Sequence, residues 1–158
     1  MIDKQIKVLL IEDNPTDARL IQKMVKEKSW ASFDLTCVDK LQAGLKHLSN
    51  GGADIVLLDL DLPDSTGLDT FIKVHNHKAE VPVVVLTGLE DEKIGVEAVQ
   101  KGAQDYLVKG HVDGDVLIRA MRYAIERQRA DEELRRSEEK NRSLLIAIPD
   151  IMFRLNKE

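Results

Sequence analysis

This chain of 158 residues lacks the features by which secreted, membrane-spanning and nucleic-acid-binding proteins are usually recognised. Its single cysteine, Cys37, cannot form a disulfide within the chain. No apolar run approaches the roughly 20 residues of a transmembrane helix, and Asp3, Lys4 and Lys7 interrupt the only apolar stretch near the amino terminus. The net charge of -5 comes without a basic stripe, which argues against a nucleic-acid surface. We therefore expect a cytoplasmic module without direct contacts to membrane or nucleic acid.

Four short apolar runs rich in β-branched residues are the most informative feature of the sequence. They are residues 8–11, 55–58, 81–86 and 106–108. Runs without a polar face are typical of strands that helices cover on both sides, as in a parallel sheet. Polar residues stand where these runs end, and they are Glu12, Asp13, Asp59, Thr87 and Lys109. Because parallel strands end on the same side of a sheet, we expect these side chains to meet in one crevice.

The three acidic residues of this set are suited to hold a divalent cation. Asp13 and Asp59 would offer carboxylate oxygens, the hard ligands that Mg2+ prefers, and a backbone carbonyl near Asp61 would add another. Glu12 would hold a coordinated water from a second layer of contacts. Carboxylates held this close repel one another unless a cation neutralises them. The sequence therefore predicts Mg2+ as the cofactor.

The same crevice contains the groups that phosphoryl transfer requires. Once its charge is neutralised, the Asp59 carboxylate can attack a phosphorus atom and form an acyl phosphate. Transfer then depends on stabilising the charge of the phosphoryl oxygens. The Lys109 ammonium would serve one oxygen and the Thr87 hydroxyl another, while Gly88 leaves open space and an accessible backbone N–H. We therefore expect a phosphoryl site at Asp59.

Strand-like and helix-like segments alternate along the first 126 residues, which is the pattern of repeated βαβ units. Asp13, Asn14 and Pro15 signal a helix start after the first strand. The further elements expected are a strand at 33–38, a helix at about 41–48, a loop rich in turn formers at 61–67, a helix at 68–75, a helix ending near Gly102 and a last helix beginning at 113–115. The total is five strands and five helices, joined by right-handed crossovers.

The composition changes near Glu126. From there to Arg142 the chain has no glycine or proline and almost no apolar side chains, so it cannot form a core alone. We expect it to continue the last helix into solvent. A loose heptad seam would consist of Ala120, Tyr123, Arg127, Ala130, Leu134, Ser137, Asn141, Leu144 and Ile148. Two interpretations stay open: a homodimer through this helix, which we favour slightly, and a single solvated helix with charges paired at i,i+4 spacing.

Several motifs together resemble the receiver domain of two-component response regulators over residues 5–126. They are Glu12-Asp13, the run from Leu57 to Gly67 around Asp59, Leu86-Thr87-Gly88, and the run from Ala103 to Gly110 around Lys109. The resemblance implies an α/β fold of the flavodoxin-like kind. Such a fold is a doubly wound, five-stranded parallel sheet in the order 2-1-3-4-5, here followed by an extended C-terminal helix.

The resemblance also implies a function. Asp59 would be the phosphoacceptor, taking a phosphoryl group from a histidine kinase, a phosphotransfer protein or a small acyl phosphate. Thr87 and Tyr106 would be a switch pair that, on phosphorylation, reshapes the face formed by the fourth helix, the fifth strand and the fifth helix. The chain would then be a phosphoacceptor switch whose only chemistry is its own phosphorylation and dephosphorylation, not an enzyme.

Residues 134–155 resemble the lead-in helix and first strand of a PAS sensor domain, which cannot close from so short a segment. We therefore expect a fragment of a larger signalling protein. A receiver domain would occupy 1–126, an extended helical linker and possible coiled coil 127–143, and the truncated start of a PAS domain 144–158. The last helix would relay the change near Tyr106 to the PAS domain and the output module beyond it.

Two other functions are compatible with parts of the sequence. Asp59-Leu60-Asp61 matches the nucleophile-x-acid pair of haloacid-dehalogenase-like phosphatases, but there the motif normally follows the first strand and precedes a cap insertion. The other alternative is a receiver-like interaction module that dimerises without taking phosphate, against which the intact acidic site argues. Phosphoryl incorporation that depends on Asp59 would exclude the inert module, whereas sustained turnover of a phosphomonoester would favour the phosphatase.

Overall fold

The computed structural model describes residues 5–28 and 32–147, with side chains placed as far as residue 142. Among these residues, five parallel strands form one sheet: β1 (Ile6–Ile11), β2 (Phe33–Val38), β3 (Ile55–Asp59), β6 (Val83–Thr87) and β7 (Asp105–Val108). Their order is β2-β1-β3-β6-β7, which is the predicted order 2-1-3-4-5 of the main strands. The chain therefore has the flavodoxin-like fold.

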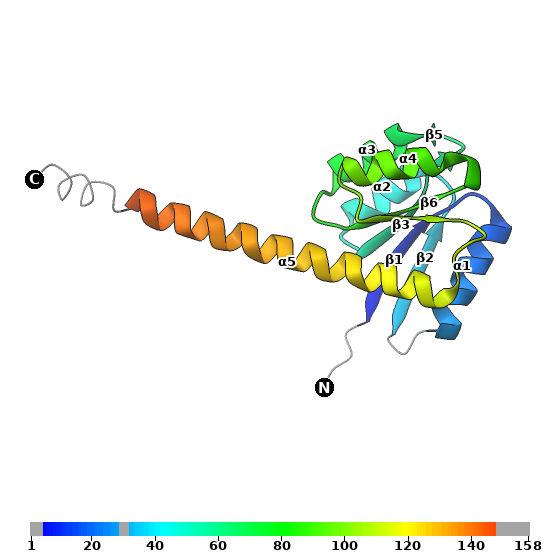
Figure 1. Cartoon of the computed structure of the whole chain (residues 1–158), viewed down its shortest axis with the longest axis horizontal. Coiled ribbons are helices and arrows are strands. Elements are labelled where there is room, and N and C mark those ends of the chain that lie inside the picture. The colour runs from blue at the N-terminus through cyan, green and yellow to red at the C-terminus, as the bar shows by residue number, and fades with distance from the viewer. Residues whose placement is uncertain (1–4, 29–31, 148–158) are drawn as a thin grey trace, which may run out of the picture.

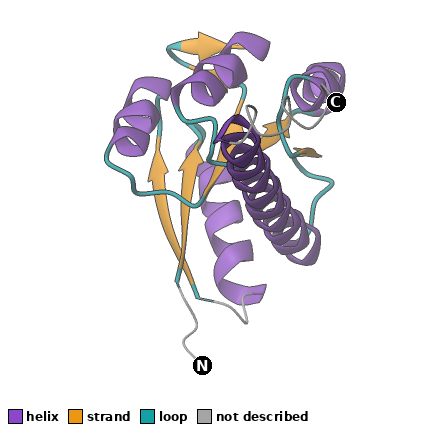
Figure 2. Ribbon diagram, turned by 90° about the vertical axis from the view of Figure 1, so that its left-hand side faces the viewer, coloured by secondary structure: helices purple, strands orange, loops and turns teal. Residues whose placement is uncertain are grey.

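Helices cover both faces of this sheet (Figures 1 and 2). The elements are α1 (Pro15–Lys28) and α5 (Gly114–Ala147) on one face, and α2 (Leu41–Ser49), α3 (Leu68–His77) and α4 (Glu92–Gln100) on the other. Because neighbouring strand residues face opposite sides, Val8 and Leu10 pack toward α1 and α5, whereas Leu9 and Ile11 pack toward α2 to α4. The apolar runs of β1, β3 and β6 are thus buried on both faces, as the sequence predicted, whereas the run of the edge strand β7 is only partly buried.

The start of α1 follows the predicted capping signal. The Asn14 Oδ1 atom accepts hydrogen bonds from the backbone N–H groups of Thr16, at 2.9 Å, and Asp17, at 3.1 Å. Pro15, which has no N–H to leave unpaired, occupies the first helical position. The first turn of α1 is thereby fixed beside the end of β1.

The segment after β3 is more ordered than the loop expected there. It contains two short antiparallel strands, β4 (Asp61–Leu62) and β5 (Ser65–Thr66). Between them, the Asp64 carboxylate accepts hydrogen bonds from the backbone N–H groups of Leu41 and Gln42, at 2.9 and 3.0 Å. These bonds lower the pKa of Asp64, with the Gln42 N–H as the largest cause. The segment is therefore tied to the start of α2 by contacts that are distant in sequence.

Two further differences concern the fourth strand of the sheet and the segment after it. We expected a strand from Val81, but β6 begins at Val83, because Pro82 has no N–H for the sheet ladder. Its carbonyl still accepts a hydrogen bond from Val56 at 3.0 Å. A 3-10 turn, η1 (Leu89–Asp91), then leads into α4.

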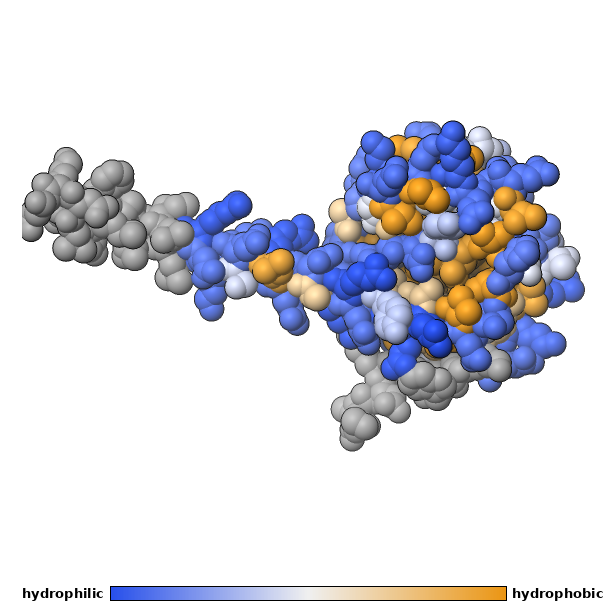
Figure 3. All heavy atoms as spheres, viewed as in Figure 1, coloured by the Kyte–Doolittle hydropathy of each residue, from blue (hydrophilic) through white to orange (hydrophobic). Residues whose placement is uncertain are grey.

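The last helix extends far beyond the sheet, as predicted. Its first part packs against the core through residues such as Leu117, Met121 and Ile125. Beyond Ile125 most of its side chains are exposed as far as residue 142, and Figures 1 and 3 show a largely hydrophilic rod leaving the body. None of the described helices is both long and apolar enough to cross a membrane.

One position of the predicted heptad seam is wrong. Ala120 is 8% exposed and belongs to the core cluster beneath α5, because this part of the helix still lies on the sheet. Tyr123 and Leu134, in contrast, are 53% and 60% exposed. The seam positions Leu144 and Ile148, and most of the predicted PAS segment 144–158, lie outside the described side chains.

Candidate functional site

The predicted polar residues lie together at the carboxyl edge of the sheet. Asp59 ends β3 and Thr87 ends β6, while Glu12 and Lys109 directly follow β1 and β7. The Lys109 backbone N–H donates to the Thr87 carbonyl at 2.8 Å, which holds the ends of these two strands side by side. The parallel topology therefore brings together residues that are far apart in sequence.

Three acidic residues form a compact cluster at this edge. Glu12, Asp13 and Asp59 each place a carboxylate oxygen within 4.8 Å of the other two. Glu12 and Asp59 are 2% and 6% exposed, whereas Asp13 faces solvent. The cluster thus has the hard oxygen donors and the open side that a divalent cation needs. The Asp61 side chain is exposed, and its backbone N–H donates to Asp59 Oδ1 at 3.1 Å.

The Lys109 ammonium lies among three carboxylates. Its Nζ atom is 3.1 Å from Asp59 Oδ2 and 3.2 Å from Asp17 Oδ2, and it also forms an ion pair with Glu12 Oε1. Asp17 was not among the residues predicted from the sequence. It stands in the first turn of α1, four residues after Asp13, but no motif marks it as a partner of Lys109. Lys109 therefore joins both the predicted nucleophile and an unexpected partner.

The buried charges at this edge shift one another's protonation. Burial raises the pKa of Glu12 to about 8, and the neighbouring Asp59 carboxylate acts in the same direction. For Lys109 burial lowers the pKa, but the Glu12 and Asp59 carboxylates outweigh it and raise the pKa above its usual range. The Lys109 ammonium thus stays charged, whereas burial and the neighbouring Asp59 carboxylate favour the protonated form of Glu12.

A cavity of about 320 Å³ opens beside Asp59. Thr87 and Gly88 line it, together with Asp61 and Asp91, and Asp91 was not singled out from the sequence. The Thr87 Oγ1 atom is buried and has no hydrogen-bond partner among the described residues. A buried hydroxyl without a partner costs free energy, which an incoming acceptor oxygen would recover. The cavity therefore fits a small group rich in acceptor oxygens.

Tyr106 lies close to Thr87 and packs against α4. Its hydroxyl donates to Glu92 Oε1 at 3.0 Å, and this bond is the main reason why the pKa of Tyr106 is raised. A Cβ atom on Gly95 would come within 2.8 Å of the Tyr106 ring and 3.1 Å of the Thr87 methyl group. The Tyr106 ring and the Thr87 side chain thus pack against α4 at Gly95, where a residue larger than glycine would clash with them.

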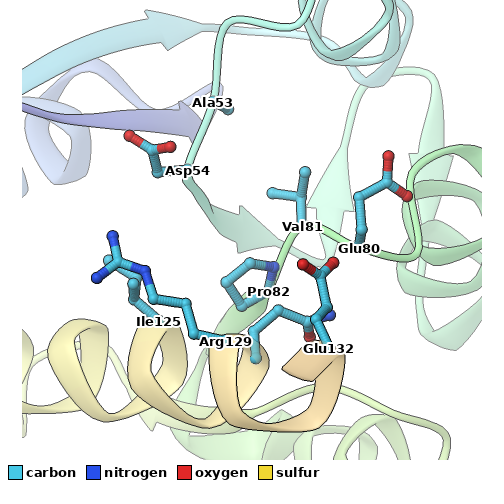
Figure 4. A pocket seen from close by; sticks show the side chains of 9 residues that line it. Ala53, Asp54, Glu80, Val81, Pro82, Ile125, Arg129 and Glu132 are labelled. Carbon is cyan, nitrogen blue, oxygen red and sulfur yellow. The ribbon is translucent and has the colours of Figure 1, made fainter. Parts of the chain in front are cut away.

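A second cavity, of about 210 Å³, lies at the opposite edge of the sheet. Figure 4 shows it between α5 and the residues that precede β3 and β6, with Asp54, Glu80, Arg129 and Glu132 around it. None of the predicted site residues lines this cavity. The chemistry expected from the sequence therefore belongs to the carboxyl edge alone.

Curated proteins similar to this chain are bacterial regulators. It is 33% identical over 104 residues to the swarming motility regulation protein RssB of Serratia marcescens, covering 66% of this chain and 46% of the relative. It is 32% identical over 123 residues to the KDP operon transcriptional regulatory protein KdpE of Escherichia coli, strain K12, covering 78% and 52%. The chain thus spans about half the length of these relatives.

Solved structures show the same fold. A response regulator receiver domain protein from Clostridium thermocellum superposes with a TM-score of 0.70 at 24% identity, covering 79% of this chain and 98% of that one. The Mn2+-bound form of response regulator Rcp1 gives a TM-score of 0.60 at 25% identity, covering 73% and 88%. The sequence family described as the response regulator receiver domain matches residues 8–122. This match spans most of the chain, which therefore belongs to the response regulator receiver family.

Proposed function

We propose that this chain is the phosphoacceptor module of a two-component signalling protein. Asp59 receives a phosphoryl group from the phosphohistidine of a histidine kinase or a phosphotransfer protein, or from a small acyl phosphate. The observation that carries this proposal is that Asp59 and the unpartnered Thr87 hydroxyl line one cavity, while the Lys109 ammonium lies 3.1 Å from Asp59 Oδ2. This arrangement provides a nucleophile and two donors for the oxygens of the group it receives.

The transfer exchanges one bond to phosphorus for another. An Asp59 carboxylate oxygen forms the new O–P bond, and the P–N bond of phosphohistidine or the P–O bond of an acyl phosphate breaks with its electron pair on the leaving group. Lys109 and Thr87 donate hydrogen bonds to phosphoryl oxygens, and Gly88 leaves the space they occupy. The chain acts as a switch, because its only chemistry is the formation and loss of its own acyl phosphate.

Glu12, Asp13 and Asp59 would hold Mg2+, with the backbone carbonyl of Asp61 as a further ligand and Glu12 acting through water. The support is the set of carboxylates within 4.8 Å of one another and the exposed position of Asp13, which leaves a path for entry. The related Rcp1 has been solved with Mn2+ bound, another divalent cation that prefers oxygen ligands. The cation supplies charge neutralisation between the carboxylates and the phosphoryl group.

Phosphorylation would act on the surface formed by α4, β7 and α5. Drawing the Thr87 hydroxyl toward a phosphoryl oxygen moves its methyl group, which borders the space of the Tyr106 ring. The ring then exchanges its hydrogen bond to Glu92 for a position further inside. The movement of Thr87 favours the inward position of Tyr106, and the reverse also holds. The acyl phosphate therefore shifts this surface from one of its two states to the other.

The α5 helix would carry this change to an output module in the same protein. Its support is the continuous helix from Gly114 to Ala147, which crosses both predicted domain boundaries. A PAS domain after residue 143 is our proposal for the next module. Homodimerisation through the exposed part of α5, with Tyr123 and Leu134 in the contact, is the proposal for how two chains assemble.

The mass of the intact chain tests the phosphoacceptor function directly. Incubation with acetyl phosphate and Mg2+ should add one phosphoryl group to the wild type and none to Asp59→Asn. Asp61→Asn is the matched control, because it makes the same change two residues away on an exposed side chain and should still be phosphorylated. A phosphorylated Asp59→Asn variant would contradict the assignment.

The same experiment separates the two rival functions. A wild-type chain that takes no phosphoryl group from acetyl phosphate or from a phosphorylated histidine kinase would be the inert receiver-like module. Sustained hydrolysis of a phosphomonoester, lost in both Asp59→Asn and Asp61→Asn, would identify a haloacid-dehalogenase-like phosphatase. The described structure argues against the phosphatase, because Asp59 ends the third strand and a short hairpin of two-residue strands, not a cap insertion, follows it.

A further inference from the structure

Asp17 is the one partner of the Lys109 ammonium, among the described residues, that lies outside the acidic cluster of Glu12, Asp13 and Asp59. A lysine ammonium has three N–H donors, and here three carboxylates, from Glu12, Asp17 and Asp59, surround it. Two of the three belong to the predicted cation ligands. Asp17 therefore differs from the others in having no assigned role.

The backbone fixes the position of Asp17. Asn14 accepts a hydrogen bond from the Asp17 N–H at 3.1 Å, so the residue belongs to a capped first helical turn. The next residue, Ala18, is buried in the core, which anchors this turn of α1 on the sheet. The Asp17 side chain is 34% exposed and Lys109 is 22% exposed, so solvent screens their pair only in part. A carboxylate near a helix N-terminus is also favoured by the helix dipole.

A divalent cation in the acidic cluster and the Lys109 ammonium would share two carboxylates, those of Glu12 and Asp59. Cation binding withdraws negative charge from Glu12 and Asp59, and the two positive charges repel each other. Without another partner, the Lys109 ammonium would turn into solvent, away from the phosphoryl oxygen that it should contact. Asp17 offers a carboxylate oxygen at 3.2 Å that lies outside the acidic cluster.

We propose that Asp17 is a positioning residue, which retains the Lys109 ammonium beside Asp59 when a divalent cation occupies the acidic cluster. This inference rests on the proposed phosphoacceptor function. Asp17 contributes in two ways: it lowers the cost of displacing Lys109 from Glu12 and Asp59, and it keeps the ammonium within reach of the phosphoryl group. Both effects act through Lys109, so both vanish when Lys109 is absent.

A double-mutant cycle on Mg2+ affinity tests this coupling without any catalytic readout. The four chains are the wild type, Asp17→Asn, Lys109→Ala and the double variant, and calorimetric titration with Mg2+ gives each dissociation constant. Asp17→Asn should weaken Mg2+ binding about three- to tenfold when Lys109 is present, and clearly less when it is absent. Equal factors in the two backgrounds would mean that Asp17 contributes only its charge, and would overturn the proposal.

Asp39→Asn is the matched charge control. Asp39 is exposed, lies just after β2 at the same edge of the sheet, and forms no ion pair with Lys109 among the described residues. The Asp39→Asn variant should change the Mg2+ affinity by the same small factor whether or not Lys109 is present. Coupling to Lys109 as large as that of Asp17 would show that any nearby acid acts in this way, and would contradict a specific role.

Phosphorylation kinetics provide the second readout. At saturating Mg2+, Asp17→Asn should slow phosphoryl incorporation from acetyl phosphate severalfold, and Asp17→Glu, which can still reach Lys109, should restore most of the rate. A rate equal to that of Asp39→Asn would overturn the positioning role. If the wild type takes up no phosphoryl group, the proposed function fails instead, while the Mg2+ cycle still decides the coupling of Asp17 to Lys109.

Discussion

The carboxyl edge of the sheet and the exposed part of α5 are both dense in charged residues, yet they use them in opposite ways. At the edge, Glu12 is 2% exposed and Lys109 contacts three carboxylates. On α5, the pair of Glu132 and Arg136 is 3.9 Å apart, and the Arg136 side chain is 79% exposed. The residue types are the same, and only their surroundings differ.

Burial decides which of these charges can do chemistry. A buried charge loses its hydration, so its neighbours determine its protonation and its free energy. A charge on a solvated helix keeps its hydration, and its ion pairs contribute little. Perturbation of one group at the edge should therefore spread to the others, whereas changes on the exposed part of α5 should stay local.

Removing the ammonium at the edge should have the largest effect. Lys109→Ala should still bind Mg2+, but it should lose most of the phosphorylation-induced change at Tyr106. The reason is that no ammonium group then links the phosphoryl group to the end of β7. Hydrogen exchange of α4 and β7, measured with and without acetyl phosphate, reports this change. Equal responses in the variant and the wild type would contradict the role given to Lys109.

The pH dependence of stability should reveal the buried Glu12. Its pKa is raised from 4.5 to about 8 in the folded chain, so folding opposes its ionisation. Without Mg2+, stability should therefore fall as the pH rises from about 4.5 toward 8, by up to a few kcal/mol, and level off above that range. Urea unfolding across this range measures the slope.

Glu12→Gln is the control for this slope, because it keeps the shape of the side chain without its charge. The variant should lose the part of the slope that belongs to residue 12. A slope that persists unchanged would assign the titration to another group. Saturating Mg2+ should flatten the slope in the wild type, since the cation compensates the carboxylate charge.

Shortening α5 should have a small effect on the body. A chain that ends after Arg127 keeps Ile125, Met121 and the other core residues of α5. It should therefore fold, become phosphorylated by acetyl phosphate and remain monomeric. It loses the Gln104–Gln128 hydrogen bond and should be destabilised by about 1 kcal/mol or less. Thermal unfolding and sedimentation equilibrium give the stability and the mass.

A chain that ends after Ala120 is the control, because it removes Met121, Ala124 and Ile125 from the core and should not fold. Unfolding of the longer chain as well would place the domain boundary further along α5. If the full chain is a dimer and the chain ending after Arg127 is a monomer, the exposed part of α5 carries the contact. Two monomers would indicate a single solvated helix.

Single ion pairs on the exposed part of α5 should have the smallest effect. Arg136→Ala removes the pairing with Glu132 and should change the free energy of unfolding by about 0.3 kcal/mol or less. The charge-conserving Arg136→Lys serves as control. An effect of several kcal/mol would mean that this part of α5 is packed against a partner and not solvated.

Much of the candidate site followed from the sequence, because its residues stand where apolar strand runs end. Glu12, Asp13, Asp59, Thr87 and Lys109 meet at the carboxyl edge as expected, since a parallel sheet aligns the ends of its strands. The roles assigned to them stay predictions until phosphorylation is measured. The strand order implied by the resemblance to receiver domains was confirmed as well.

Contacts between elements could not be predicted from the sequence. No motif marks Asp17, in the first turn of α1, or Asp91, in η1, and only the packing of these elements brings them beside Lys109 and the cavity. Asp64 caps α2 across more than 20 residues of chain, and it lies between the two strands of the β4–β5 hairpin, where a loop was expected. Ala120 fits a heptad by spacing but lies in the core.

By itself, the sequence determined the main strands and helices and the residue types at the strand ends, because these depend on local periodicity and on the geometry of parallel strands. The order of the strands followed from the resemblance to receiver domains. The tertiary structure decided which carboxylates reach Lys109, how deeply Glu12 is buried and where α5 leaves the core. The physical reason is that burial and charge coupling are properties of packed surfaces, and the residues that form those surfaces are distant along the chain.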